Sequence, residues 1–219
     1  VEPIAGNMNM IKPITGFLSG LRSLCDHYQS LLIFDEVMTG FRVHIGSAQE
    51  MYNVSPDLTT LGKVIGGGMP IGAIAGKQQY MDHLAPLGTV YQAGTLSGNP
   101  ISMAAGLATL QQLSPDHYQK LEAIGNKLIT GMSTIAQQTN TPFSGHCLGG
   151  MFGFFFLDDI PTTYSEALRM NASKFQAFFG HMLGSGIYLA PSIYEAGFIS
   201  LSHTTEDIER TLAIFSQYL

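Results

Sequence analysis

The pattern of apolar and polar positions predicts alternating helices and strands in the first half of the chain. Apolar residues recur at helical spacing over residues 18–28. The continuous apolar run Leu31–Phe34 that follows is typical of a parallel strand covered on both faces. Two more short strands are expected near Leu58–Leu61 and Ile71–Ala75. This order predicts an α/β fold with a mainly parallel sheet.

The second half of the chain has a different pattern. A brief helix over 78–85 and a helix that begins at about Pro100, a residue suited to the first helical turn, close the first part. Beyond them we expect a small α+β domain. Its predicted elements are a long amphipathic helix over 114–139, an aromatic strand over 149–158, a helix from 173 that stops at a glycine, a strand up to 192, and a last helix with a threonine N-cap over 204–219. We therefore divide the chain into residues 1–113 and 114–219.

The composition narrows the class of protein. Charged residues make up 12% and hydrophobic residues 45%, which is typical of a well-buried globular chain. The net charge of −6 and the scattered basic residues argue against a nucleic-acid partner. No apolar run reaches the roughly 18 residues of a membrane span. Cys25 and Cys147 form no CxxC pair, so we expect reduced thiols in a cytosol-like compartment.

The chain begins with VEPIAGN, without a methionine or a targeting pattern. Residues 1–4 resemble the end of a strand that is already under way. We therefore expect the chain to be a fragment of a longer protein.

Two residues stand out as candidates for chemistry. Asp35 ends the predicted strand 31–34, and the carboxyl ends of parallel strands are where open α/β sheets bind ligands. Taken alone, a cap of the next turn by Asp35 or Glu36 explains the acid equally well. Lys63 lies among glycines in an apolar segment, and a partly desolvated lysine can form a Schiff base with a carbonyl compound. Taken alone, an ordinary surface lysine at a turn is the better interpretation.

The pair is more informative than either residue. Pyridoxal phosphate needs a lysine for its aldehyde and an acid on its pyridinium nitrogen, and Lys63 with Asp35 meets both needs. The segment YQAGTLSGNP adds backbone N–H groups and hydroxyls from Gly94, Thr95, Ser97 and Gly98 ahead of a helix, which predicts a phosphate-binding turn. A polar loop with an N-cap explains that segment equally well. The seven histidines lack metal-ligand spacing, so no metal is assigned.

Six segments together resemble the glutamate-1-semialdehyde 2,1-aminomutase family, which consists of fold-type I pyridoxal-phosphate enzymes related to the class III aminotransferases. They are VEPIAGNMNM, LLIFDEVMTGFRV, PDLTTLGKVIGGGMPIGA, YQAGTLSGNP, GGMFGFFF and GIYLAPSIYEAGFISLSHT. The resemblance covers essentially all 219 residues and corresponds to about the C-terminal half of a family member. It implies that residues 1–113 are the C-terminal part of the cofactor-binding large domain and that 114–219 are the small C-terminal domain.

The resemblance also implies roles for single residues. Lys63 would hold the cofactor covalently and carry protons between substrate carbons, and Asp35 would pair with the pyridinium nitrogen. Val37 would pack against the ring, Asn7 would lie near the phenolic oxygen, and Glu195 would line the substrate pocket.

The family's partners and reaction follow from the same resemblance. Gly94 and Thr95 would bind the cofactor phosphate of the neighbouring subunit, which implies a homodimer. The substrate would be a small amino-aldehyde, (S)-4-amino-5-oxopentanoate, converted to 5-aminolevulinate for tetrapyrrole synthesis. The compartment would be the cytoplasm, or the plastid stroma in a photosynthetic eukaryote.

Two features favour an aminomutase over its relatives. Asn7 stands where many class III aminotransferases have a Gln-Gly-Glu type of pattern, and the segment around Glu195 has no arginine for a second carboxylate. Two alternatives stay open. One is another class III aminotransferase that uses an external oxo acid, and the other is a truncated chain without catalytic activity.

Overall fold

The computed structural model describes all residues from Val1 to Leu219, and these fold as two compact units. The first unit consists of Val1–Pro3 and Pro13–Pro115, and the second of Ile4–Lys12 and Asp116–Leu219. The expected assignment of 1–113 and 114–219 to domains with separate roles stays a prediction.

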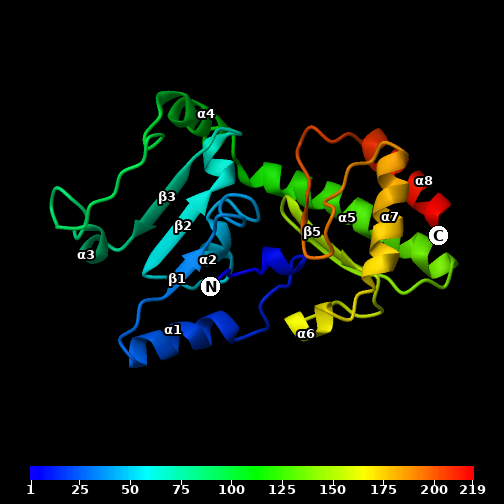
Figure 1. The fold of residues 1–219 in the computed structure, drawn as a ribbon, viewed down its shortest axis with the longest axis horizontal. Coiled ribbons are helices and arrows are strands. Elements are labelled where there is room, and N and C mark those ends of the chain that lie inside the picture. Colours follow the sequence, from blue (N-terminus) through cyan, green and yellow to red (C-terminus); the bar gives the residue numbers. More distant parts are fainter. The chain divides into compact units, whose positions relative to one another are not determined.

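The first unit is built on a three-stranded sheet in the order β1-β2-β3 (Figure 1). Its elements are α1 (Phe17–His27), β1 (Ile33–Asp35), α2 (Ser47–Met51), β2 (Leu58–Gly62), the 3-10 helix η2 (Lys63–Gly66), β3 (Gly72–Gly76), α3 (Gln78–Met81) and α4 (Pro100–Leu110). Every helix and strand expected in this part of the sequence is present, and α2 and η2 are additional. The α/β class is confirmed.

The sheet is mixed, whereas the sequence predicted a mainly parallel one. β1 and β2 are parallel, but β2 and β3 are antiparallel. Only the connection Lys63–Ile71 joins β2 to β3. A parallel return would need a crossover of a dozen residues or more, so this short connection turns the chain back on itself.

One face of β1 is covered within this chain, and the other is open. Phe34 is fully buried and packs with Leu32, Val54 and Leu18 of α1. Ile33, which points to the opposite face, is 41% exposed. The expectation of a strand covered on both faces is therefore wrong for this chain, because its own elements cover only the α1 side.

Buried Asp57 joins the start of β2 to its neighbours. Its carboxylate accepts hydrogen bonds from Arg22 Nη1 at 2.7 Å, Lys77 Nζ at 2.6 Å and the Leu32 amide at 2.8 Å. Burial alone would raise the pKa of Asp57, but the bonds from Lys77, Leu32 and Arg22 outweigh it and hold the pKa at about 2. Asp57 is therefore a charged structural link between α1, the residue before β1 and the residue after β3.

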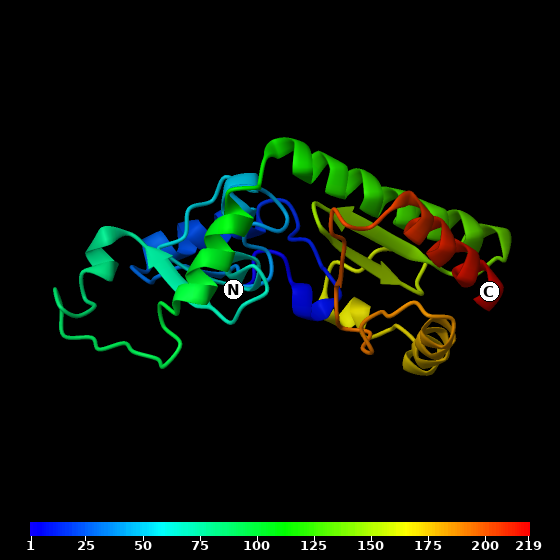
Figure 2. The same ribbon diagram turned by 90° about the horizontal axis from the view of Figure 1, so that it is seen from above.

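The second unit is an antiparallel sheet, β4-β5-β6, with helices around it. Its elements are η1 (Gly6–Met8), α5 (Pro115–Gln138), β4 (Ser144–Leu148), β5 (Met151–Phe155), α6 (Tyr164–Ala167), α7 (Ala172–Gly184), β6 (Gly197–Phe198) and α8 (Thr205–Tyr218). Helix α8 runs alongside α5 (Figure 2), and Lys127 Nζ lies 2.8 Å from Glu209 Oε1 between them.

The predicted elements of the second unit are present except for one strand. The strand expected up to residue 192 is wrong: that segment is irregular, and only β6 follows it. Pro191 cannot donate to a strand ladder, which disfavours pairing there. The sequence pattern also missed β4, because its small and polar residues SGHCL lack an apolar alternation.

No helix of the protein is both long enough and apolar enough to cross a membrane.

Side chains from α5, β5, α7 and α8 form the main core of the second unit. Phe178 of α7 is fully buried at its centre. Its ring lies 5.5 Å from that of Phe154, 5.3 Å from Phe156 and 5.9 Å from Phe215, mostly edge to face. The opposite face of β5 buries Phe155 in a smaller cluster.

We expect Phe178→Ala to lower the free energy of unfolding of the second unit by about 3–5 kcal/mol, because the lost ring leaves a cavity among other rings. The measurement is chemical denaturation followed by far-UV circular dichroism. Leu183→Ala on the same helix is the control: Leu183 is 46% exposed, and its loss should change stability by only about 0.5 kcal/mol. Equal losses in the two variants would contradict the packing described here.

His146 of β4 makes the second unit sensitive to acid. Burial lowers the pKa of His146 to about 4, against a weaker opposing effect of its 2.6 Å contact with the Met10 carbonyl. The His146 imidazole therefore takes up a proton more readily in the unfolded chain than in the folded chain.

We expect the stability linked to His146 to be fully present above pH 6.5 and to fall as the pH drops from 6.5 towards 4. The loss should total about 2–3 kcal/mol. Unfolding free energies of the parent and of His146→Gln, measured across this range, test it. The variant should have the shallower slope, and parallel slopes would show that His146 does not control the transition.

Candidate cofactor site

Asp35 lies at the carboxyl end of β1, opposite Thr60 of the parallel strand β2. Its side chain is exposed. Its Oδ1 accepts a hydrogen bond from the Val37 amide at 3.0 Å and one from Thr60 Oγ1 at 3.2 Å. The structure thus places Asp35 at the edge of the sheet where open α/β proteins bind ligands.

Glu36 explains why the strand ends on two acids. It is fully buried. Its Oε2 accepts from Thr39 Oγ1 at 2.9 Å and from the Ala48 amide at 2.7 Å, and its Oε1 accepts from the amide and side chain of Gln49. A buried carboxylate is tolerated only with such partners. Glu36 therefore anchors the segment after β1 to the start of α2, while Asp35 faces outward.

Lys63 follows β2 directly, at the same end of the sheet as Asp35. Lys63 lies three positions after Thr60, the partner of Asp35, which corresponds to roughly 10 Å along an extended backbone. The Lys63 side chain is exposed, so the partial desolvation expected from its apolar surroundings is absent in this chain.

The backbone of Lys63 is in an unusual conformation. Its φ of 49° lies in the left-handed region, where a residue with a side chain carries about 1–3 kcal/mol of strain. Such strain persists where the surrounding structure fixes it, and it clusters at functional sites. Seven other residues that are not glycine also have a positive φ, so the functional role of Lys63 stays a prediction.

The glycines after Lys63 have a packing role. A Cβ atom at Gly67 would lie 2.5 Å from the Ala105 carbonyl oxygen, and one at Gly106 would collide with the Ile65 carbonyl. Helix α4 therefore packs directly on the backbone of η2. Ser102 Oγ of α4 also donates to the Pro70 carbonyl at 3.0 Å.

Two further glycines leave the sheet bare between Thr60 and Lys63. Gly62 of β2 pairs with Gly72 of β3, two residues beyond the pair of Thr60 and Ile74 and on the same face. A Cβ atom at Gly62 would lie 3.2 Å from Val37 Cγ1. Val37 therefore packs directly on the backbone of Gly62, whereas Gly72 faces open space, since a Cβ atom there would meet no atom within 4 Å.

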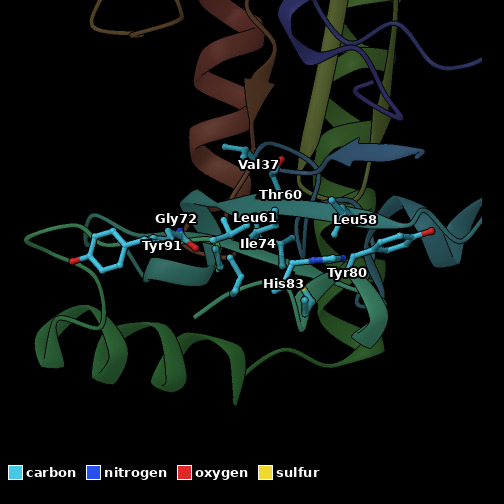
Figure 3. Close-up of a pocket in the computed structure, with 14 residues that line it drawn as sticks. Val37, Leu58, Thr60, Leu61, Gly72, Ile74, Tyr80, His83 and Tyr91 are labelled. Atoms are coloured by element: carbon cyan, nitrogen blue, oxygen red, sulfur yellow. The ribbon is translucent and has the colours of Figure 1, made fainter. Parts of the chain in front are cut away.

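A cavity of about 690 Å³ opens on β2 and β3. Its lining includes Val37, Thr60 and Gly72, and also Tyr80 and His83 from α3 and the residues after it. Figure 3 shows Val37 next to Thr60, with Tyr80 and Tyr91 pointing away from them in opposite directions. Asp35 and Lys63 are not among the lining residues, so the cavity adjoins the candidate site without containing its charged groups.

The remaining predicted site residues lie elsewhere. Gly94 and Thr95 are exposed in the segment before α4, where the Asn99 side chain caps the helix by accepting from the amides of Ile101 and Ser102. Asn7, in η1, and Glu195, before β6, are both exposed and belong to the second unit. The roles of all these residues stay predictions.

Two residues of the site, Thr60 and Glu36, had no functional role in the sequence analysis. Glu36 was considered only as a cap, and Thr60 not at all. The contact between Thr60 and Asp35 depends on the register of β1 and β2. The sequence does show Thr60 as a polar residue near the end of an apolar strand. Only the pairing of β1 with β2 shows that its partner is Asp35.

Comparison with known proteins places the chain in a family. All of residues 1–219 match the family model described as aminotransferase class-III. The chain is 55% identical over 221 residues to a glutamate-1-semialdehyde 2,1-aminomutase of Francisella tularensis subsp. holarctica (strain FTNF002-00 / FTA), covering 100% of this chain and 51% of that protein. The chain thus spans about half the length of the curated relatives it matches.

Solved structures agree with this match. A transaminase with pyridoxal phosphate bound superposes with a TM-score of 0.87 at 28% identity, and a β-phenylalanine aminotransferase from Variovorax paradoxus with 0.88 at 29% identity. Each comparison covers 100% of this chain and 50% of the other. On the match over its full length and on this shared fold, the chain belongs to the class-III aminotransferase family.

Proposed function

We propose that the chain supplies the lysine and the acid of a pyridoxal-phosphate site. The observation that carries this proposal is the placement of Lys63 and Asp35 at the carboxyl ends of two adjacent parallel strands, with a glycine-paired patch of sheet between them. Val37 packs on the backbone of Gly62 and also lines the neighbouring cavity with Gly72, so its open side is available to a flat ring. The related transaminase with pyridoxal phosphate bound supports the same cofactor.

The residues of the chain have separate tasks in this proposal. Pyridoxal phosphate, when bound, supplies an aldehyde for amines and a ring that takes up the electron pair of a broken C–H bond. The Asp35 carboxylate would stabilise a proton on the ring nitrogen, Val37 would hold one face of the ring, and Lys63 would be the residue that holds the aldehyde end of the cofactor. With substrate bound, the free Lys63 Nζ would move a proton from one substrate carbon to the other.

We propose an intramolecular amino transfer as the reaction of the whole protein. The substrate would be (S)-4-amino-5-oxopentanoate and the product 5-aminolevulinate, a step of tetrapyrrole synthesis. Identity of 55% to a glutamate-1-semialdehyde 2,1-aminomutase supports this choice. The exposed segment with Gly94 and Thr95 would bind the cofactor phosphate of a second subunit in a homodimer. A cytoplasmic or stromal location completes the proposal and is supported by the free thiols Cys25 and Cys147.

A second candidate is a class III aminotransferase with an external oxo acid. The structural likeness to the β-phenylalanine aminotransferase favours it. Incubation of the whole protein with glutamate 1-semialdehyde alone distinguishes the two: an aminomutase forms 5-aminolevulinate without an added acceptor. Dependence on pyruvate or 2-oxoglutarate would favour the aminotransferase instead.

We expect borohydride reduction of the protein mixed with pyridoxal phosphate to leave a pyridoxyl group on the peptide that contains Lys63. Lys63→Ala should lose both the adduct and the visible absorption band, because Lys63 is the lysine that directly follows β2 at the edge of the sheet where Asp35 lies. Lys120→Ala on the exposed side of α5 is the control and should keep both. If peptide mapping still finds an adduct in Lys63→Ala, the assignment of Lys63 as the lysine that binds the cofactor is wrong.

We expect Asp35→Asn to raise the dissociation constant of pyridoxal phosphate by about 10–100-fold, because a charged hydrogen bond to the ring nitrogen is lost. Proton abstraction from substrate should slow as well. Equilibrium titration by absorbance measures the constant. Asp158→Asn, which removes one exposed charge from the second unit, should leave the affinity unchanged, and equal affinities in all three proteins would remove Asp35 from the site.

A further inference from the structure

The two oxygens of Asp35 have unequal surroundings. Oδ1 accepts from the Val37 amide and from Thr60 Oγ1, whereas Oδ2 accepts no hydrogen bond within the chain. The backbone on either side of this carboxylate is also held. The Asp35 amide donates to the Val1 carbonyl at 2.8 Å, and the Glu36 amide donates to the Thr60 carbonyl at 3.0 Å. With the backbone fixed, the remaining freedom of Asp35 is rotation of its side chain.

Thr60 is suited to remove this freedom. As a β-branched residue on a strand it has a restricted χ1 angle, so its hydroxyl is held in place without a long flexible side chain. The register sets it directly opposite Asp35. With the Val37 amide as its only donor, the Asp35 carboxylate would be free to turn about a single hydrogen bond. The second hydrogen bond to Oδ1, from Thr60 Oγ1, fixes the plane of the carboxylate.

We propose that Thr60 is a positioning residue for Asp35, holding Oδ1 so that Oδ2 faces the ring nitrogen of the cofactor. This inference rests on the proposed pyridoxal-phosphate site and adds a residue to it. Thr60 makes no contact with the reacting atoms in this scheme. Its effect reaches the chemistry through the orientation of the carboxylate, because a displacement of a supporting group by a fraction of an ångström weakens a charged hydrogen bond.

Thr60→Val isolates the hydroxyl. Valine keeps the β-branched shape and the strand preference of threonine, so the fold should persist while the bond to Oδ1 is lost. Thr60→Ser restores the hydroxyl without the methyl group. Thr59→Val is the matched control, because Thr59 is the neighbouring threonine of β2 and points to the opposite, buried face.

The experiment compares these variants of the protein loaded with pyridoxal phosphate labelled with ¹⁵N in the ring. The nitrogen chemical shift reports whether the ring nitrogen is protonated, and absorbance titration gives the dissociation constant. For Thr60→Val we expect a smaller protonated fraction and a dissociation constant raised about tenfold, the effect of one lost hydrogen bond to a charged group. Turnover of the whole protein should show a lower kcat with KM unchanged.

The outcomes separate this proposal from the one it rests on. Recovery in Thr60→Ser and parental values in Thr59→Val would support positioning by the hydroxyl. A parental nitrogen shift and affinity in Thr60→Val would overturn the role of Thr60 while leaving the cofactor site intact. Equal changes in Thr59→Val and Thr60→Val would show a merely structural effect and overturn it too. If the parent protein itself binds no pyridoxal phosphate, the proposed function and this inference both fail.

Discussion

The parallel pairing of β1 with β2 is the constraint on which the candidate site depends. Because the two strands run in the same direction, Asp35 and Lys63 reach the same edge of the sheet although 27 residues lie between them in sequence. The register then sets Thr60 opposite Asp35 and leaves the paired glycines next to it. An antiparallel pairing would have sent the acid and the lysine to opposite ends of the sheet.

Adjacent residues with similar chemistry have opposite roles around this edge. Asp35 is exposed and carries the proposed cofactor contact, while Glu36 is buried and secures the segment that carries Val37. The alternation of side chains along a strand produces this division, because neighbouring residues point to opposite faces. The same alternation separates Thr59 from Thr60. Each proposed site residue on this sheet, Asp35 or Thr60, therefore has a buried neighbour in the sequence, Glu36 or Thr59.

The glycines around Lys63 likewise serve two purposes. Gly67 and Gly106 let α4 approach the backbone of η2, whereas Gly62 and Gly72 keep the sheet free of side chains. The first pair stabilises the turn in which Lys63 adopts its left-handed conformation. In the second pair, Gly62 lets Val37 pack on the strand backbone, and Gly72 faces open space. Close packing and open space are thus produced by the same residue type at positions a few residues apart.

The sequence by itself determined the class of fold and most of the helices and strands, and it led to the proposal of Asp35 as the acid and Lys63 as the lysine of the site. The spacing of apolar residues and the signals for helix ends, such as Asn99 followed by Pro100, depend on neighbouring residues in the sequence. They can be recognised without knowledge of the fold. Only the tertiary structure decided the mixed sheet, the open face of Ile33, the exposure of Lys63 and the contact of Thr60 with Asp35. Each of these depends on which strands pair and in which register, and such contacts join residues that are distant in the chain. The sequence pattern missed β4 for the same reason. Its partner β5 supplies the apolar environment, and the residues of β4 themselves give no sign of it.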